Sequence, residues 1–136
     1  MAYNVTVVGA FETVAFPLFG IDGIKAKIDT GAYTGALHCT KISEEKTGTN
    51  KVLRFSPFDR PEVTIIAEEF IVRYVKSSNG DSQKRYFIET TITVQGKNYP
   101  IALSLANRSE MKWPVLIGRR FLRKNNFLVD VTKSDK

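Results

Sequence analysis

The residues best placed to do chemistry in this sequence are Asp29, Thr30 and Gly31, which directly follow a short apolar stretch. In residues 24–28, apolar side chains alternate with two lysines, which is the period of a half-buried β-strand. Asp29 therefore lies where a strand ends, and Gly31 permits a close approach that a Cβ would prevent. A carboxylate held on such a turn can act as a general acid or base. The same residue types also favour an ordinary turn, so the tripeptide alone leaves both interpretations open.

The composition of the 136-residue chain is typical of one folded domain, spanning residues 1–136. Hydrophobic residues make up 43% and charged residues 25%, which excludes a disordered or fibrous protein. Cys39 is the only cysteine, so no disulfide can form within the chain, and we expect a cytoplasmic location. The sequence starts without a signal-peptide pattern, and no apolar stretch is long enough to span a membrane.

The formal net charge of +6 limits the partners only loosely. The basic residues are dispersed, apart from one cluster at Arg119, Arg120, Arg123 and Lys124. We interpret this cluster as the solvated face of a helix, because no nucleic-acid-binding motif accompanies it. We therefore expect no nucleic-acid partner and keep a basic RNA-binding β-barrel as an alternative hypothesis.

Short strand patterns separated by turn residues occupy most of the chain. We predict strands over residues 3–9, 24–28, 36–42, 51–56, 86–94, 99–105, 114–118 and 127–131. Residues 63–75 are expected to begin a three-stranded meander that ends at residue 105, with a hairpin turn at Ser77-Ser78-Asn79-Gly80. A proline in residues 11–19 indicates an edge strand or a turn, and residues 44–50 are expected to form a polar loop. One short helix is predicted over 119–125.

Two motifs carry a resemblance that covers nearly the whole chain. They are Ile24-Lys25-Ala26-Lys27-Ile28-Asp29-Thr30-Gly31-Ala32 and Val115-Leu116-Ile117-Gly118-Arg119, the second followed by the short helix and a last strand. This order of parts resembles the retropepsin-like aspartic proteases. Together with Ala36-Leu37-His38, Ser77-Ser78-Asn79-Gly80, Asn107-Arg108-Ser109 and Arg120, it is similar to one bacterial branch. Members of that branch are labelled ATP-dependent zinc proteases and are associated with RimK-type ATP-grasp ligases.

The resemblance implies an all-β fold, a closed barrel of the pepsin and retropepsin kind with one short C-terminal helix. It also implies a homodimer, in which two copies of Asp29 would meet at the two-fold axis. Two carboxylates about 3 Å apart cannot both ionise, so they share one proton. The ionised carboxylate acts as a general base on water, and the protonated one polarises the peptide carbonyl. The implied activity is that of an aspartic endopeptidase.

The resemblance also implies roles for the residues around Asp29. Thr30 would brace both loops across the dimer axis, and Gly118 would let its strand pass close behind the loop. A flap with its tip at 77–81 would close over a peptide and exclude water, and the last strand would help to build the dimer interface. Gly31 joins Asp29 and Thr30 in the catalytic motif, where it would accept the substrate backbone. The residues implied to bind substrate are Ala32, Ser78, Asn79, Gly80, Gly118 and Arg119.

The sequence departs from the retroviral pattern in three places. Tyr33 stands where the retroviral enzymes have an acidic partner for the helix arginine and where the bacterial branch usually has an arginine, so Arg119 lacks that partner. The flap tip is polar instead of glycine-rich, and residues 42–62 have no retroviral counterpart. A catalytically silent dimer of the same fold, which binds or regulates an ATP-grasp ligase, therefore stays as the alternative function.

A catalytic zinc usually takes three protein ligands, and the sequence offers only one histidine and one cysteine. His38 and Cys39 are adjacent and would point to opposite faces of a strand, so we expect both to be buried structural residues. No glycine-rich phosphate loop is present either. We predict no metal site and no cofactor, and any ATP would be bound by a partner ligase.

Basic residues near the predicted flap favour a peptide or protein substrate that is acidic. These residues are Arg73, Lys76, Lys84 and Arg85, and Arg108 is expected in a loop that approaches the cleft. Glutamate-rich tails of the kind that an ATP-grasp ligase could add would be one such substrate.

Overall fold

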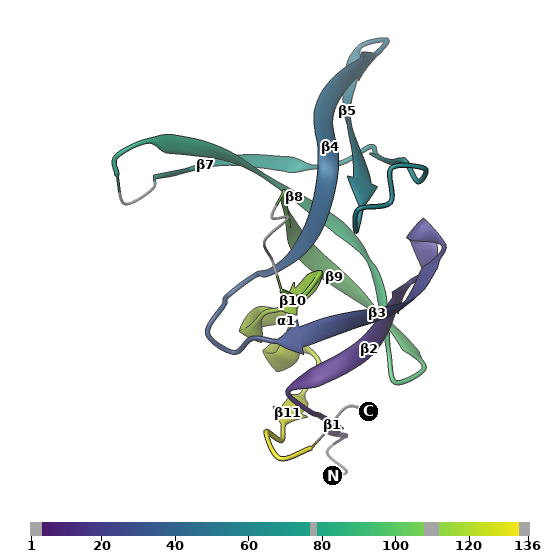
Figure 1. Cartoon of the computed structure of the whole chain (residues 1–136), viewed down its shortest axis with the longest axis vertical. Helices are drawn as coiled ribbons and strands as arrows, with labels where there is room; N and C mark the ends of the chain where they lie inside the picture. The colour runs from purple at the N-terminus through teal and green to yellow at the C-terminus, as the bar shows by residue number, and fades with distance from the viewer. Residues whose placement is uncertain (1–3, 77–78, 108–111, 134–136) are drawn as a thin grey trace.

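The structure is a computed structural model, and it describes residues 4–76, 79–107 and 112–133. Most of these residues lie in β-strands (Figure 1). The strands are β1 (Thr6–Val8), β2 (Phe11–Phe16), β3 (Ile21–Ile28), β4 (Gly35–Thr47), β5 (Asn50–Pro57), β6 (Ile65–Ala67), β7 (Ile71–Lys76), β8 (Ser82–Val94), β9 (Lys97–Ala106), β10 (Val115–Ile117) and β11 (Phe127–Val129). A 3-10 helix, Pro17–Phe19, follows β2, and the α-helix α1 spans Arg119–Lys124.

Six strands close on themselves to form a barrel, in the order β10-β3-β2-β8-β9-β4. The closing element is β10, which pairs in parallel with β3 and antiparallel with β4. On its other side β4 lies parallel to β9, and this pairing completes the ring. The predicted all-β closed barrel with a short helix near the end of the chain is confirmed.

Alternating apolar side chains fill the barrel interior, as the period of a strand requires. Ile92 of β8 and Leu103 of β9 are fully buried. Phe16 and Phe55 are also fully buried, and burial of one such ring stabilises a fold by about 1.5–3 kcal/mol. Packing in the core therefore fixes the positions of the strand ends, and with them the start of the loops that follow.

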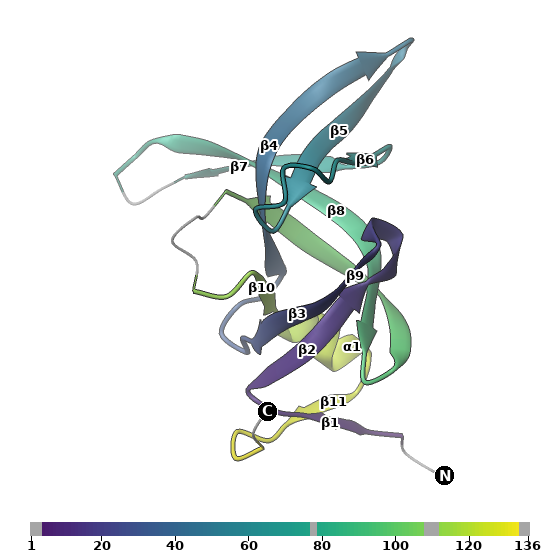
Figure 2. The same cartoon turned by 45° about the vertical axis from the view of Figure 1, so that its right-hand side comes forward.

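Two hairpins extend beyond the barrel, as Figures 1 and 2 show. The hairpin of β4 and β5 projects in one direction, and we call its outer part, residues 42–54, the arm. The hairpin of β7 and β8 projects in another, and we call residues 71–87 the flap. In the flap, Ile71 pairs with Phe87 and Lys76 pairs with Ser82. The hairpin that the Asn-Gly signal predicted is therefore confirmed.

A separate two-stranded sheet joins the two ends of the chain, where β1 lies parallel to β11. The side chains of Val8 and Phe127, on its inner side, are buried. Val5, Val7 and Leu128 are 38%, 41% and 59% exposed, and Val7 is directly paired with Leu128. The sheet thus presents an uncovered apolar strip at the end of the molecule that carries both termini in Figure 1. In the part of the chain that the structure describes, no helix is long and apolar enough to cross a membrane.

Two strand predictions were wrong because of where the chain turns. Residues 11–19 begin with β2, which lies between β3 and β8 inside the barrel and not at an edge. Pro17 starts the 3-10 helix after β2, where its missing N–H removes no hydrogen bond from the sheet. Residues 63–75 are divided between β6, which pairs with β5, and β7, which pairs with β8. The three-stranded meander therefore consists of β7, β8 and β9.

The prediction of a polar loop at residues 44–50 was also wrong. β4 continues to Thr47 and β5 begins at Asn50, so the turn is confined to Gly48 and Thr49. The polar residues form strands because they pair across the hairpin, and Leu53 of β5 anchors the arm in the hydrophobic core. An ion pair between Glu45 and Arg54, 3.1 Å apart, links its two strands.

Candidate active site

The loop that follows β3, residues 29–34, is held by backbone hydrogen bonds of Asp29 and by one hydrogen bond to its carboxylate; we call it the Asp29 loop. The Asp29 N–H donates to the Ile117 carbonyl at 2.8 Å, and the Asp29 carbonyl accepts the Ala32 N–H at 3.2 Å. The carboxylate oxygen Oδ1 accepts the Gly31 N–H at 3.1 Å. Asp29 is half-buried, so its side chain stands at the end of the strand and remains accessible.

Thr30 and Gly31 form the exposed tip of this loop, and Ala32 is half-buried behind them. A Cβ at Gly31 would lie 3.3 Å from the Asp29 Oδ1 atom. Glycine at this position therefore lets its N–H approach the carboxylate without crowding.

Gly118 lies directly behind the loop. A Cβ at this position would be 2.6 Å from the Tyr33 carbonyl oxygen and 2.9 Å from that of Ala32. The residues that follow tie the start of α1 to the loop, because the Arg119 N–H donates to the Ala32 carbonyl at 2.8 Å and the Arg120 N–H donates to the Tyr33 carbonyl at 3.1 Å. The close approach at Gly118 makes these two hydrogen bonds possible.

The Arg119 side chain also binds the loop. Its Nη1 donates to the Gly31 carbonyl at 3.1 Å and lies 3.5 Å from the Thr30 carbonyl. The Arg119 guanidinium carbon is 5.4 Å from the centroid of the Tyr33 ring, and that of Arg120 is 6.0 Å away. Such cation–π contacts are worth about 0.5–1 kcal/mol at exposed sites. Tyr33 thus offers its ring to Arg119 at the position where the retroviral pattern has a carboxylate.

A cavity of about 830 Å³ lies between the flap and the last two residues of the Asp29 loop, Tyr33 and Thr34, and Asp29 is not among the described residues that line it. Thr34 of the loop and Ile71 and Phe87 of the flap contribute to its walls. Its charged wall residues are Glu68, Glu69, Arg73, Glu89 and Arg120. The volume is within the range of sites that bind small molecules or a few side chains.

The flap tip is only partly within the described residues. Asn79 Oδ1 accepts the Asp81 N–H at 3.2 Å, and Gly80 has a φ of +92°, a turn conformation that favours glycine. Ser78 lies outside the described residues. Arg108, which was predicted to lie near the cleft, does too.

His38 and Cys39 are both buried, as predicted, at 4% and 0% exposure. His38 Nε2 lies 2.8 Å from Asp59 Oδ1. Burial raises the pKa of the Cys39 thiol to about 12, because the thiolate would be poorly solvated there. Over the part of the chain that the structure describes, no three His, Cys, Asp or Glu side chains are grouped so that they could hold a metal ion.

The sequence matches a known family over most of its length. Residues 7–135 match the RimB-like family model, described as retropepsin-like aspartic endopeptidase RimB. The chain belongs to this family. A crystal structure of the protein Lpg0085 from Legionella pneumophila, described as having unknown function, matches with a TM-score of 0.76 and 26% identity over 95% of both chains.

Several curated relatives carry the name "Probable alpha-L-glutamate ligase". The protein from Shewanella pealeana is 35% identical over 139 residues, and the one from Desulfotalea psychrophila is 32% identical over 118 residues. These matches cover 98% and 83% of this chain but 30% and 25% of the relatives. The chain thus spans less than a third of the length of the curated relatives it matches.

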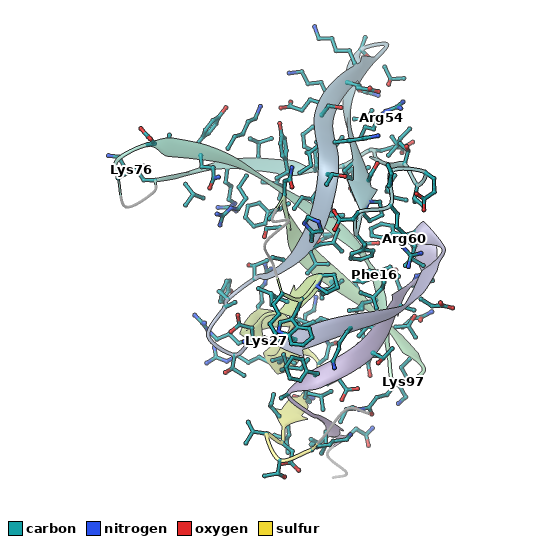
Figure 3. The ribbon with its side chains drawn as sticks, in the orientation of Figure 1. Phe16, Lys27, Arg54, Arg60, Lys76 and Lys97 are labelled. Carbon is teal, nitrogen blue, oxygen red and sulfur yellow. The ribbon has the colours of Figure 1, made fainter. Side chains whose placement is uncertain are left out.

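The charged residues near the site are arranged differently from the sequence interpretation. Lys84 is bound to Glu44, and the Arg73 guanidinium lies 5.9 Å from the Phe87 ring, so both basic groups have partners within the chain. Lys27, two residues before Asp29, is exposed on the outer face of β3 (Figure 3 labels Lys27), whereas the ammonium group of Lys25 lies 5.1 Å from the Phe11 ring and 5.2 Å from the Trp113 ring. Sequence reasoning treated both lysines only as the polar side of a strand, although the alternation that ends at Asp29 already placed them there.

Proposed function

We propose that this protein is an aspartic endopeptidase that acts as a homodimer, with Asp29 of both subunits in one active site. The observation that carries the proposal is the half-buried Asp29 carboxylate, fixed at the end of β3 in a chain of the retropepsin-like family. In a two-fold dimer the two carboxylates would share one proton. The ionised carboxylate takes a proton from water as the water oxygen attacks the peptide carbonyl, and the protonated one donates a hydrogen bond to the carbonyl oxygen.

The apolar strip on β1 and β11 supports the dimer. Its residues Val7 and Leu128 are paired side by side, Val5 precedes β1, and all three are exposed. Uncovered apolar surface of this kind marks an interaction site, and a second copy of the chain would cover it. Thr30, exposed at the loop tip, would then brace its partner loop across the axis.

The flap and the loop supply the remaining parts of the proposed site. Gly31 and Ala32 would meet the substrate backbone, while Ser78, Asn79 and Gly80 would close over it from the flap. The cavity beneath the flap would then hold a substrate side chain. Gly118 and Arg119 act from behind, because they hold the loop that carries Asp29.

Acidic peptides are the proposed substrates, and an α-L-glutamate ligase is the proposed partner that would produce them. The names of the relatives, the net charge of +6, and the exposed Lys27 two residues before Asp29 support this choice. Cations near the scissile bond would attract glutamate side chains, and added salt would screen that attraction. The carboxylates of the cavity wall would repel glutamate side chains, so the preference would apply only to the substrate positions next to Asp29.

Sedimentation equilibrium of the wild type and of Asp29→Asn tests the dimer, and peptide cleavage then tests the chemistry. We expect both proteins to be dimers and only the wild type to cleave, with poly-glutamate cut faster than a neutral peptide of equal length at low salt. Asparagine has nearly the shape of aspartate, so the variant separates the lost carboxylate from a lost fold. Cleavage by Asp29→Asn at the wild-type rate would refute the proposal. A strict monomer at high concentration would make a non-catalytic binding module the better explanation.

A further inference from the structure

The arm contacts the outer side of the flap through one carboxylate, Glu44. Its Oε2 accepts a hydrogen bond from the Lys84 ammonium group and another from the Tyr86 hydroxyl group, the latter at 2.7 Å. Lys51 adds a longer contact, with 3.9 Å between its Nζ and Glu44 Oε1. Lys84 and Tyr86 are 40 and 42 positions away in the sequence, so this contact joins two separate hairpins. Figures 1 and 2 both show the arm and the flap leaving the barrel close together.

Glu44 and its neighbour Glu45 differ in what they contact. Glu44 is paired in the sheet with Leu53, which is fully buried, and its own side chain is 21% exposed. Glu45 points to the other face of the strand, is 42% exposed and pairs with Arg54 within the arm. The chain therefore offers two adjacent carboxylates, one bound to the flap and one bound only within its own hairpin.

Glu44 binds the flap where the flap leaves the barrel. The pairing of β8 with β9 begins at Tyr86, whereas residues 82–85 are paired with β7. Lys84 and Tyr86 thus lie on either side of this point and share one face of β8. Phe87 and Arg73, on the other face of the flap, line the cavity. A contact on the outer face can therefore set how far the inner face stands from the Asp29 loop.

The protonation states of Glu44 and Tyr86 suit the hydrogen bonds of this contact. The hydrogen bond from Lys84, followed by that from Tyr86, lowers the pKa of Glu44. Burial, followed by the bond to Glu44, raises the pKa of Tyr86. At neutral pH the carboxylate is therefore ionised and the phenol keeps its proton, so both hydrogen bonds have their donors. Hydrogen bonds to a charged group are the stronger ones in proteins.

We propose that Glu44 is a positioning residue of the flap, and that its hydrogen bonds to Lys84 and Tyr86 set how far the flap stands open over the cavity. The proposal rests on the proposed peptidase function, in which the flap closes over a peptide. It also gives a role to the arm, which is part of the 42–62 segment without a retroviral counterpart. A peptide that enters the cleft must then move a flap that is held by the Glu44 contact, which lies outside the active site.

Hydrogen exchange of the wild type, Glu44→Gln and Glu45→Gln tests this role without any cleavage assay. We expect Glu44→Gln to raise amide exchange in residues 71–76 and 82–87 about tenfold, while β2 and β3 keep their wild-type rates. Glu45→Gln should leave the exchange of the flap unchanged, because its partner lies within the arm. Equal flap exchange in the two variants would overturn the proposal.

The reversed pair, Glu44→Lys combined with Lys84→Glu, provides a rescue. It should return flap exchange most of the way to the wild-type rate, whereas either single reversal should be at least as fast as Glu44→Gln. Exchange in the reversed pair as fast as in the singles would contradict a direct contact.

Cleavage kinetics separate this proposal from the proposed function. If the wild type cleaves peptides, Glu44→Gln should change KM several-fold more than kcat, because Asp29 is untouched. If the wild type cleaves nothing, the peptidase proposal fails, and the exchange pattern alone decides whether Glu44 positions the flap.

Discussion

Replacing Gly118 by alanine is a direct test of how the Asp29 loop is held. The backbone φ of Gly118 is −86°, which any residue can adopt, so glycine is required there by space alone. The added Cβ would meet Tyr33 O at 2.6 Å, Ala32 O at 2.9 Å and Gly35 N at 2.9 Å. All three are backbone atoms, so no side-chain rotation can relieve the clash.

The expected cost follows from these contacts. Overpacking a filled site costs about 1–3 kcal/mol, and a clash with three fixed atoms belongs at the upper end of that range. A displaced strand would also weaken the hydrogen bonds from Arg119 N–H and Arg120 N–H to the loop, worth about 1 kcal/mol each. We therefore expect Gly118→Ala to lower the free energy of unfolding by about 4–5 kcal/mol. For a domain of this size that corresponds to a fall in Tm of about 15 °C.

Thermal and urea unfolding of Gly118→Ala and Gly23→Ala would measure this cost. Gly23 has a φ of +68°, and a Cβ added there would meet nothing within 4 Å, so its substitution should cost only the left-handed strain of about 1–2 kcal/mol. If Gly118→Ala is no less stable than Gly23→Ala, the close approach behind the loop is not what holds it. Failure to recover folded Gly118→Ala, with Gly23→Ala folded, would agree with the calculation.

Two further predictions concern residues around the site. The Cys39 thiol keeps its proton in the folded chain to about pH 12 but ionises near pH 9.0 when unfolded, so the unfolded state binds fewer protons in this window and stability should fall as pH rises through it. Urea unfolding of the wild type and Cys39→Ala across this range checks the sign, and an equal slope in both would contradict it. Tyr33→Leu should lose about 0.5–1 kcal/mol of stability with the Arg119 contact, while Tyr33→Phe keeps the ring and should match the wild type. Equal stability of the two Tyr33 variants in urea would show that the ring contact contributes nothing.

Local periodicity was enough to predict the strands that carry the site. The alternation of Ile24, Ala26 and Ile28 places Asp29 at a strand end, and the structure has it there. Periodicity could not predict the closure of the barrel, because the three residues of β10 pair with strands that lie far away in the sequence. That closure was expected only from the resemblance to a family.

The error at residues 44–50 arose because polar residues form strands there, whereas the errors at 11–19 and 63–75 arose from where the chain turns. Residues 44–50 look like a loop by composition, yet cross-strand pairing and the Glu45–Arg54 ion pair hold them extended. The contact of Glu44 with Lys84 and Tyr86 gave no sequence signal, because no periodic pattern links residues 40 positions apart. Strand propensity depends on such neighbours more than on the residue itself.

The way in which the Asp29 loop is held also has a consequence for the order in which the protein matures. Gly31 accepts a hydrogen bond from Arg119, 88 residues further along the chain, and Asp29 donates to Ile117. A chain growing from its N-terminus therefore exposes the Asp-Thr-Gly tripeptide long before the residues that fasten it exist. Contacts of such long range form late in folding. A nascent chain or a fragment that stops short of β10 carries the tripeptide on an unfastened loop, so any activity that depends on this loop waits for the closed barrel.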